Sequence, residues 1–365
     1  MKRLIVCSDG TFGTPQIAYV TNVVKMTRAI APIGPATPPA SGTATQLVFY
    51  DPGVGTEGSL WRRALGGVSG LGLSKNIREC YEFLVQNYEA GDEIFILGFS
   101  RGAYTARSLA GFLRNSGLLK PEHAGRLGEA FDLYRSDSHP DSPEAITFRE
   151  DYSQEQEVTV RFLGVWDTVG SLGIPPLGRF SFFQPVADRL NRPFQFHDVE
   201  LSGSVKNAYH ALAIDERRAS FPLAIWKPKE VGGVVVSRAP KPGQVIEQVW
   251  FAGYHNSLGG GELDSGLSDI TFTWMMEKAK ACDLAFNSAF VSATIRPNEL
   301  GRARDSRTTF WRLAGTFIRN LGTTWHETEH VHQVVLNRQR LAAYDPNNLV
   351  RYQNGPNYQI MPPPP

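Results

Sequence analysis

Short, mostly apolar runs recur along the chain and are separated by polar or glycine-rich segments. The clearest runs are 4–7, 46–50, 94–97, 158–166 and 245–251. Runs of this length and composition are typical of central parallel strands that helices cover on both faces. A further strand is expected at 221–226 and a surface hairpin at 231–236. The pattern predicts a mostly parallel sheet.

Between these runs, apolar residues recur at helical spacing. In 74–88, the side chains of Ile77, Tyr81, Leu84 and Tyr88 share one face, with Ser74 expected as cap and Gly91 as stop. The predicted helices are 21–31, 74–88, 121–135, 202–214, 263–282 and 327–341, together with one that follows the run at 94–97. Strands that alternate with helices predict an α/β doubly wound fold, with helices on both faces of the sheet.

Two segments depart from this alternation. Residues 171–200, directly after the strand at 158–166, are rich in Pro, Gly and Phe and have no clean period. Such an irregular insertion is either a lid or lipid-facing flap, or a loop whose aromatic rings pack on the domain. Residues 346–365 are expected to form a Pro-rich tail. We therefore expect one α/β domain at 1–345.

The pentapeptide GFSRG at 98–102 matches the G-x-S-x-G pattern and lies between an apolar strand and a helix. In this setting the serine takes a strained conformation, and the flanking glycines let strand and helix approach closely. The alternative is an ordinary tight turn. The context favours Ser100 as an exposed nucleophile.

A serine nucleophile needs a base, and the base needs a carboxylate that fixes its tautomer. His255 follows a predicted strand and lies C-terminal to Ser100, and Asp167 ends the strand between them. This is the chain order of α/β-hydrolases. Asp215 is the reserve acid. The alternatives are an Asp167 that only caps a turn and a His255 that bonds loop backbone.

The negative charge that develops on an attacked ester needs two backbone N–H donors. One is expected from Arg101, the residue after the serine. The other is expected from the loop that ends the first strand, where Gly10 and Thr11 are the candidates.

Composition excludes several classes of function. Lys plus Arg number 37 against 36 Asp plus Glu, a net charge of +1, so no long-range field favours nucleic acid. The three cysteines are widely spaced, which predicts reduced residues rather than a disulfide framework or a Cys metal site. The first apolar run is too short for a signal peptide and no run reaches membrane-spanning length. We expect a cytoplasmic protein, or one exported without a cleavable signal peptide.

Two other motifs offer competing interpretations. Residues 53–58 match G-x-G-x-x-G after a strand, but 61–72 are too glycine-rich for the close-packed helix of a dinucleotide site, so no cofactor is expected. Residues 326–330 match H-E-x-x-H, in which His326 and His330 would bind zinc and Glu327 would act as base. The runner-up functions are therefore a zinc hydrolase, for which no third ligand is evident beyond the candidate Asp345, and a non-catalytic protein that keeps the fold.

Six motifs together resemble one known family. They are CSDGT at 7–11, YDPGVGT at 50–56, GFSRGAYTAR at 98–107, GVWDTVG at 164–170, HALAIDERR at 210–218 and WFAGYH at 250–255. In this order they resemble the α/β-hydrolase domain family that includes phospholipase effectors of bacterial type VI secretion and many fungal relatives. The resemblance spans about 3–340. One departure is Ser257, where family members usually have Asp.

The resemblance implies an α/β-hydrolase fold and esterase or phospholipase A activity, with Ser100, Asp167 and His255 at the triad positions. Sequence and resemblance together predict a serine carboxyl-ester hydrolase that acts through an acyl-enzyme, without metal or cofactor. Its expected partners are an ester or lipid substrate and, transiently, a membrane surface. The sequence sets no oligomeric state.

Overall fold

The computed structural model describes residues 1–10, 19–37, 42–53, 70–136, 138–169, 201–219, 221–227, 229–231, 234–237, 240–303, 316–323 and 327–361. The segment 171–200, expected to be a lid, flap or packed loop, lies outside the described residues.

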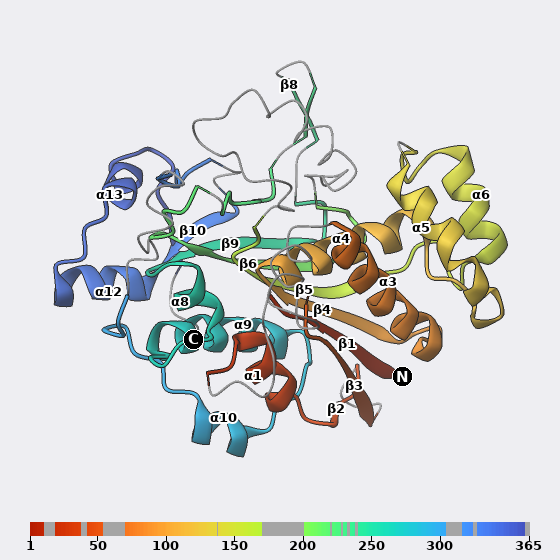
Figure 1. Cartoon of the computed structure of the whole chain (residues 1–365), viewed down its shortest axis with the longest axis horizontal. Coiled ribbons are helices and arrows are strands. Elements are labelled where there is room, and N and C mark those ends of the chain that lie inside the picture. The colour runs from red at the N-terminus through yellow and green to blue at the C-terminus, as the bar shows by residue number, and fades with distance from the viewer. Residues whose placement is uncertain are drawn as a thin grey trace.

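The described chain is built on a nine-stranded sheet in the order β11-β10-β9-β6-β5-β4-β1-β3-β2 (Figure 1). Its strands are β1 (Lys2–Ser8), β2 (Ile33–Pro35), β3 (Thr43–Asp51), β4 (Glu93–Phe99), β5 (Val160–Trp166), β6 (Asn207–Ala213), β9 (Val245–Phe251), β10 (Glu329–His332) and β11 (Ile360–Met361). All neighbours are parallel except β2 and β3, which are antiparallel. The predicted α/β architecture with a mostly parallel sheet is confirmed.

Helices cover both faces of the sheet (Figure 1). They are α1 (Asn22–Ala29), α3 (Gly70–Asn87), α4 (Arg101–Ser116), α5 (Leu127–Arg135), α6 (Pro143–Tyr152), α8 (His255–Gly259), α9 (Gly266–Ala281), α10 (Ser288–Thr294), α12 (Gln333–Ala342) and α13 (Asn347–Gln353), with a 3-10 turn at Pro121–Arg126. No described helix is both long and apolar enough to cross a bilayer.

The apolar run of β4 shows why the sheet needs two helical layers. Ile94 and Ile96 pack in the core with α3 and α4, whereas Phe95 and Leu97 pack in the core with α1 and α9. Because strand side chains alternate between faces, a run that is apolar at every position buries both faces. The strand that carries the GFSRG motif therefore lies at the centre of the fold, as predicted.

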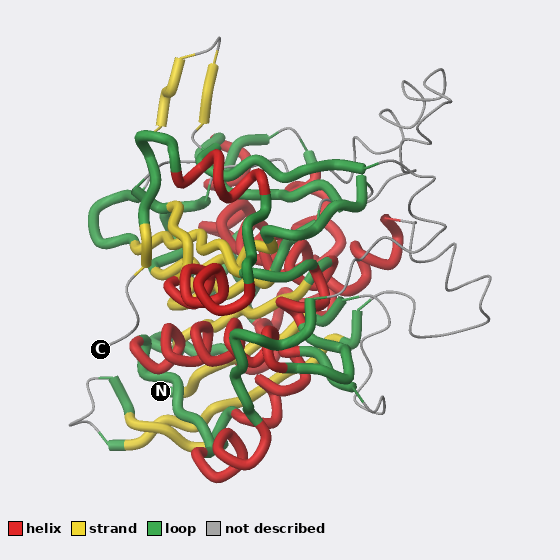
Figure 2. The backbone as a smooth tube through the Cα atoms, turned by 90° about the vertical axis from the view of Figure 1, so that its left-hand side faces the viewer, coloured by secondary structure: helices red, strands yellow, loops and turns green. Residues whose placement is uncertain are grey.

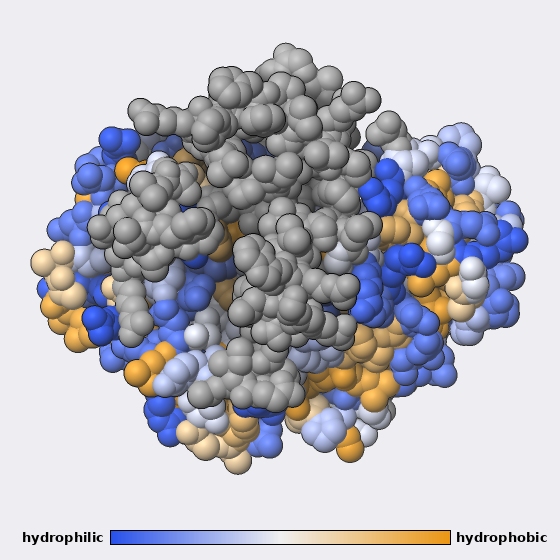
Figure 3. Space-filling model, in the orientation of Figure 1, coloured by the Kyte–Doolittle hydropathy of each residue, from blue (hydrophilic) through white to orange (hydrophobic). Residues whose placement is uncertain are grey.

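The surface mixes hydrophilic and hydrophobic residues over the described part of the face in Figure 3. The predicted hairpin is present as β7 (Lys229–Val231) and β8 (Val234–Ser237), an antiparallel pair that projects from the body (Figure 2). Cys7, Cys80 and Cys282 are buried and unpaired, as predicted.

Three sequence predictions of local structure are wrong. The expected helix at 202–214 is instead β6, buried between β5 and β9. The expected strand at 221–226 reduces to a single bridge between Leu223 and Val169. The expected helix at 327–341 begins as β10 and becomes helical only at α12. In each case pairing across the sheet decides the structure, and a local pattern does not contain that information.

The boundaries of two further segments differ from expectation. Helix α3 begins at Gly70, so Ser74 lies inside it rather than at its cap. The described part of the expected tail, 346–361, belongs to the fold: α13 buries Leu349 and Tyr352, and β11 pairs with β10. The proline-rich composition near residue 365 led to the prediction of a tail and gave no sign of helix α13 or strand β11.

Candidate active site

Ser100 lies at a sharp turn between β4 and α4. Its backbone has φ 60° and ψ −120°, a conformation that is costly for any residue with a side chain. Its N–H donates to the Trp166 carbonyl on β5 at 3.0 Å, which helps to hold the turn. A Cβ at Gly98 would stand 2.4 Å from the Gly102 carbonyl oxygen, and one at Gly102 would stand 2.1 Å from the Ser8 carbonyl oxygen. The two motif glycines are therefore required by close backbone contact.

His255 brings its imidazole to the serine from the end of β9. Its Nε2 lies 2.8 Å from Ser100 Oγ, and its Nδ1 lies 2.6 Å from Asp167 Oδ2. The imidazole packs between Phe99, at 4.6 Å between ring centroids, and Phe221, at 4.9 Å. Hydrogen bonds and ring contacts together fix its orientation. The three side chains that the sequence singled out thus meet, although 155 residues separate Ser100 from His255.

Asp167 directly follows β5 with a positive φ of 40°. It is fully buried, and its Oδ1 accepts a hydrogen bond from the Ala213 N–H at 3.0 Å. Burial alone would raise the pKa of this carboxyl. The nearby Arg319 guanidinium and the bond to His255 outweigh burial and hold the pKa well below its usual range. Asp167 is therefore an ionised acceptor for the imidazole.

Arg319 is a site residue that sequence reasoning missed. It is 1% exposed and forks over the Asp167 carboxylate, with Nη1 to Oδ1 at 2.5 Å and Nη2 to Oδ2 at 3.1 Å. The same two nitrogens also donate to the carbonyl oxygens of Ala213 at 3.0 Å and Phe221 at 3.3 Å. The residues around Arg319 form no motif, and its partner lies 152 residues earlier. Only the fold reveals the pair.

Asp215, the reserve acid, supports the histidine loop from a distance. Its Oδ2 accepts from the Gly253 N–H at 2.7 Å and from the Tyr344 hydroxyl at 2.8 Å. The neighbouring Glu216 accepts from the His255 backbone N–H at 3.3 Å. The acidic pair in the DERR motif therefore holds the backbone around His255, while Asp167 is the carboxylate that bonds the imidazole.

The loop after β1 lies against Ser100. A Cβ at Gly10 would stand 3.1 Å from Ser100 Cβ, so only glycine leaves this space open. The Gly10 N–H donates to Asp9 Oδ1 at 2.7 Å. The other candidate donor on this loop, Thr11, lies outside the described residues, and Arg101 is the first residue of α4.

Asp9 is a second buried carboxyl at this edge of the sheet. Its Oδ2 accepts from the hydroxyls of Thr21 at 2.6 Å and Tyr50 at 2.9 Å. Burial raises the pKa of Asp9 to about 6, although these bonds and the one from Gly10 act in the opposite direction. Gly53 closes the loop from the β3 side, because a Cβ there would stand 2.4 Å from the Asp9 carbonyl oxygen. The loop after β3 thus borders the Ser100 site at Gly53, the one glycine of residues 53–58 that is described.

The H-E-x-x-H motif does not lie on one helix. His330 is on strand β10, and helix α12 begins only at Gln333. Within the motif, Glu329 accepts hydrogen bonds from Trp250 Nε1 at 2.7 Å and from the Gly322 N–H at 2.5 Å, which are structural contacts. His326 lies outside the described residues. Among those that are described, no group of His, Cys, Asp and Glu is arranged to hold a metal ion.

Ser257, the position at which this chain departs from the family pattern that the resemblance implies, lies two residues beyond His255 in α8. It is buried, and its hydroxyl has no hydrogen-bond partner among the described residues. Its Cβ lies where a side chain at Gly253 would have to be, 2.5 Å from the Cβ position there. Ser257 can therefore lie here only because residue 253 has no side chain.

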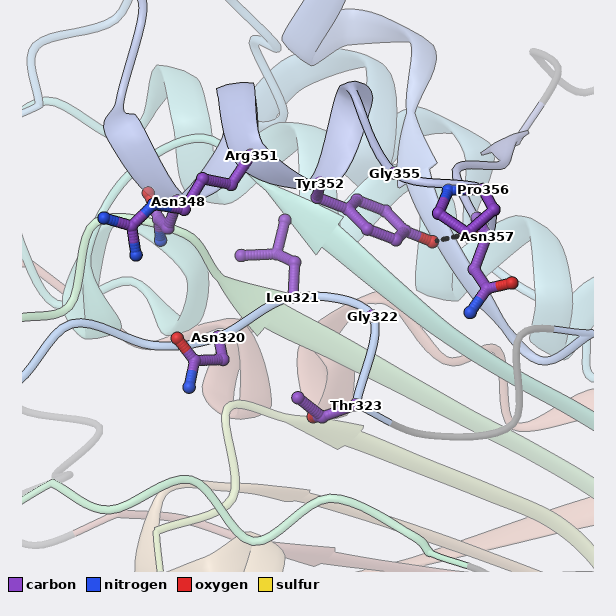
Figure 4. A pocket seen from close by; sticks show the side chains of 10 residues that line it. All are labelled: Asn320, Leu321, Gly322, Thr323, Asn348, Arg351, Tyr352, Gly355, Pro356 and Asn357. Atoms are coloured by element: carbon purple, nitrogen blue, oxygen red, sulfur yellow. Dashed lines mark hydrogen bonds between the residues drawn. The ribbon is translucent and has the colours of Figure 1, made fainter.

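A cavity of about 370 Å³ lies apart from these residues, between the segment that follows Arg319 and helix α13. Figure 4 shows the ring of Tyr352 on one side of it and Leu321 on the other, with the Tyr352 hydroxyl bonded to Asn357. Its lining is Asn320, Leu321, Gly322, Thr323, Asn348, Arg351, Tyr352, Gly355, Pro356 and Asn357. Ser100, Asp167 and His255 do not line it.

Comparison with known proteins gives a consistent family. The family model described as type VI secretion, phospholipase effector Tle1-like, catalytic domain, matches residues 2–278. The uncharacterized protein YEL023C of Saccharomyces cerevisiae (strain ATCC 204508 / S288c) is 30% identical over 251 residues, which are 62% of this chain and 33% of that protein.

Two solved structures are also similar. An uncharacterized protein from Pseudomonas aeruginosa has a TM-score of 0.47 and 18% identity, over 82% of this chain and 49% of that one. The Tle1 effector bound to the VgrG spike of the type 6 secretion system has a TM-score of 0.36 and 18% identity, over 70% of this chain and 50% of that one. The chain thus spans about half of each solved relative and a third of the yeast protein.

Proposed function

Because this chain belongs to the Tle1-like phospholipase effector family, we propose that it hydrolyses carboxyl esters of lipids, with Ser100 as nucleophile. The observation that carries the proposal is the continuous chain of hydrogen bonds from Ser100 through His255 to Asp167, at 2.8 and 2.6 Å. These distances support the proposal, because they lie in the range in which a serine nucleophile, its base and an orienting carboxylate bond one another.

In the first half-reaction, Ser100 Oγ attacks the carbonyl carbon of the ester and His255 Nε2 takes the hydroxyl proton. The bond to Asp167 selects the tautomer that leaves Nε2 free to accept this proton, and the carboxylate stabilises the imidazolium that forms. Collapse of the tetrahedral intermediate passes the proton to the leaving alcohol and leaves the acyl group on Ser100. Water, activated by His255, then releases the acid.

We propose backbone N–H groups for the developing oxyanion. Arg101 stands at the N-terminal end of α4, where the helix dipole favours negative charge. The second donor is proposed from Gly10 or Thr11. Since the Gly10 N–H already bonds Asp9, that bond would have to break for Gly10 to serve, and this favours Thr11.

The lipid class of substrate is proposed from the family, whose description names phospholipase effectors. We further propose that the protein contacts a membrane surface only transiently. Cleavage at a carboxyl ester would release a fatty acid and a lysophospholipid.

The proposal is tested by hydrolysis of short- and long-chain nitrophenyl esters and of phosphatidylglycerol vesicles. We expect wild type to release fatty acid and to be labelled by a fluorophosphonate. Ser100→Ala should do neither, whereas the exposed control Ser292→Ala should behave as wild type. Release of the phosphate headgroup instead of fatty acid, or loss of activity with a chelator, would contradict serine esterase chemistry. The absence of any turnover would favour a non-catalytic binding protein.

A further inference from the structure

We propose that Arg319 is a positioning residue of the active site: it fixes the Asp167 carboxylate and keeps the Asp167–His255 pair ready to accept a proton from Ser100. The inference rests on the proposed function. It also places a necessary residue outside 2–278, the part of the chain that the family model matches.

The two hydrogen bonds between Arg319 and Asp167 fix the orientation of the carboxylate. Both nitrogens at the end of the guanidinium bond the two oxygens of one carboxylate, and the same nitrogens are held by the carbonyls of Ala213 and Phe221. Such a planar fork fixes direction as well as distance, which a lysine cannot do. Ala213 in turn donates its N–H to Asp167 Oδ1 at 3.0 Å. Four donors, including His255, therefore leave the carboxylate one orientation.

The segment that carries Arg319 is bonded to residues 217 and 218, which directly follow the acidic pair that holds the backbone around His255. Thr316 forms an antiparallel bridge with Arg218, and the Phe317 N–H donates to the Arg217 carbonyl at 2.9 Å. On the other side, Asn348 of α13 donates to the Arg319 carbonyl at 3.1 Å and to the Ile214 carbonyl at 3.0 Å. Asn348 also lines the cavity of Figure 4, so one wall of that cavity holds the backbone of Arg319.

The positive charge of Arg319 should affect the pH at which the Asp167–His255 pair takes up an extra proton. Three other groups of charged or titratable side chains lie nearby in the part of the chain that the structure describes. His210 accepts from the Thr168 N–H through its Nε2, and Arg107 lies near His210. Glu216 lies beside His255 and is paired with Arg218. Arg319 is the cation that bonds the Asp167 carboxylate. Its positive charge disfavours an extra proton on the Asp167–His255 pair. Removing that charge makes the pair bind the extra proton more tightly, so the enzyme is switched off at a higher pH.

The test compares Arg319→Gln, which removes the charge, with Arg319→Lys, which keeps it. The rate of fluorophosphonate labelling of Ser100 is measured from pH 4 to pH 9, together with kcat and KM on a short nitrophenyl ester. For Arg319→Gln we expect the acid limb of both profiles to move up by about 1 to 3 pH units. Below the displaced limb, the rate should fall about tenfold for each pH unit. KM should stay near the wild-type value.

Arg319→Lys should keep the acid limb in place while lowering kcat, because the charge remains and the fork is lost. Arg351→Gln is the matched control, an exposed arginine on α13 that lines the cavity, and it should match wild type. An Arg319→Gln enzyme with an unmoved acid limb would overturn the inference. If that variant does not fold, an acid limb in Arg319→Lys that moves up by a full pH unit would overturn it instead. Failure of wild type to react with the probe would overturn the proposed function rather than this inference.

Discussion

Gly259 lies directly against the ring of Phe99. A Cβ at 259 would stand 2.0 Å from Phe99 Cε2 and 2.1 Å from its Cζ, so the ring fills the space that a side chain there would need. Phe99 in turn packs on the His255 imidazole. The glycine in α8 and the residue before the nucleophile therefore set the position of the proposed catalytic base together.

Gly259→Ala should displace the Phe99 ring and with it the imidazole. A displacement of about 1 Å in a reacting group can cost about 100-fold in rate, so we expect a fall in kcat of that order with little change in KM. Steady-state kinetics on a short ester measure both. Phe99→Leu in the Gly259→Ala background makes room for the new methyl group and should recover part of kcat. A double variant no better than the single one would show that displacement of the ring is not the cause.

The three side chains of the proposed triad should act as a unit. Ser100→Ala and His255→Ala are each expected to lower kcat by about 10⁴-fold or more, and combining them should add little. Asp167→Asn should also lower kcat by about 10⁴-fold, because the amide favours the wrong tautomer. Circular dichroism checks that each variant folds. Near-normal turnover in Asp167→Asn would exclude Asp167 as the acid.

Asp9 should make the protein less stable as the pH rises. Its pKa in the folded state is raised to about 6 from an ordinary value of 3.8, mainly by burial. The folded state therefore binds a proton that the unfolded state has already lost between these two values. The free energy of unfolding should fall across that window by at most about 3 kcal/mol, because each pH unit between the two pKa values lowers it by at most about 1.36 kcal/mol.

Asp9→Asn removes this titration and should flatten the dependence. The amide oxygen can accept from the Gly10 N–H, and the amide nitrogen can donate to the Thr21 and Tyr50 hydroxyls after they rotate. Urea unfolding of both proteins between pH 4 and pH 7 measures the difference. Parallel curves for wild type and variant would refute the assignment to Asp9.

Gly102 should tolerate no side chain. Since a Cβ there would meet backbone atoms of Ser8 and Asp9 at 2.1 to 2.5 Å, Gly102→Ala must force β1 away from α4. We expect a loss of about 3 kcal/mol or more of stability together with loss of activity. Gly128→Ala in α5 is the control, because nothing lies within 4 Å of its Cβ position. Alanine at 128 should stabilise the helix by about 0.5 to 1 kcal/mol. Chemical denaturation of both variants distinguishes the two outcomes.

The central strands and the turn at Ser100 could be predicted because their causes are local. The apolar run of β4 indicates burial on both faces of the sheet, and Gly98 and Gly102 indicate close contact between backbone segments. The placement of Asp167 and His255 also followed, since residues after parallel strands gather at one edge of the sheet. Their partnership is seen in the distances, and their roles in catalysis remain predictions.

The remaining features depend on contacts between distant parts of the chain. Strand β6 contains Ala208, Ala211 and Ala213, which suit a helix, but its place between β5 and β9 makes it a strand. Residues 329–332 form strand β10 because they pair with the edge of β9 that does not pair with β6. Arg319 has no local signature, because only the assembled sheet brings it to a carboxylate. Pairings of this kind are not contained in any window of sequence.

The position of Arg319 along the chain bears on the order in which the site is assembled during synthesis. A ribosome that has completed Asp167 and His255 must add the chain up to residue 319 before the buried carboxylate meets its cation, 152 residues after it was synthesised. Until then the two earlier partners share a charge that the interior disfavours. A growing chain therefore completes the hydrogen bonds around Asp167 only after residue 319 has been added.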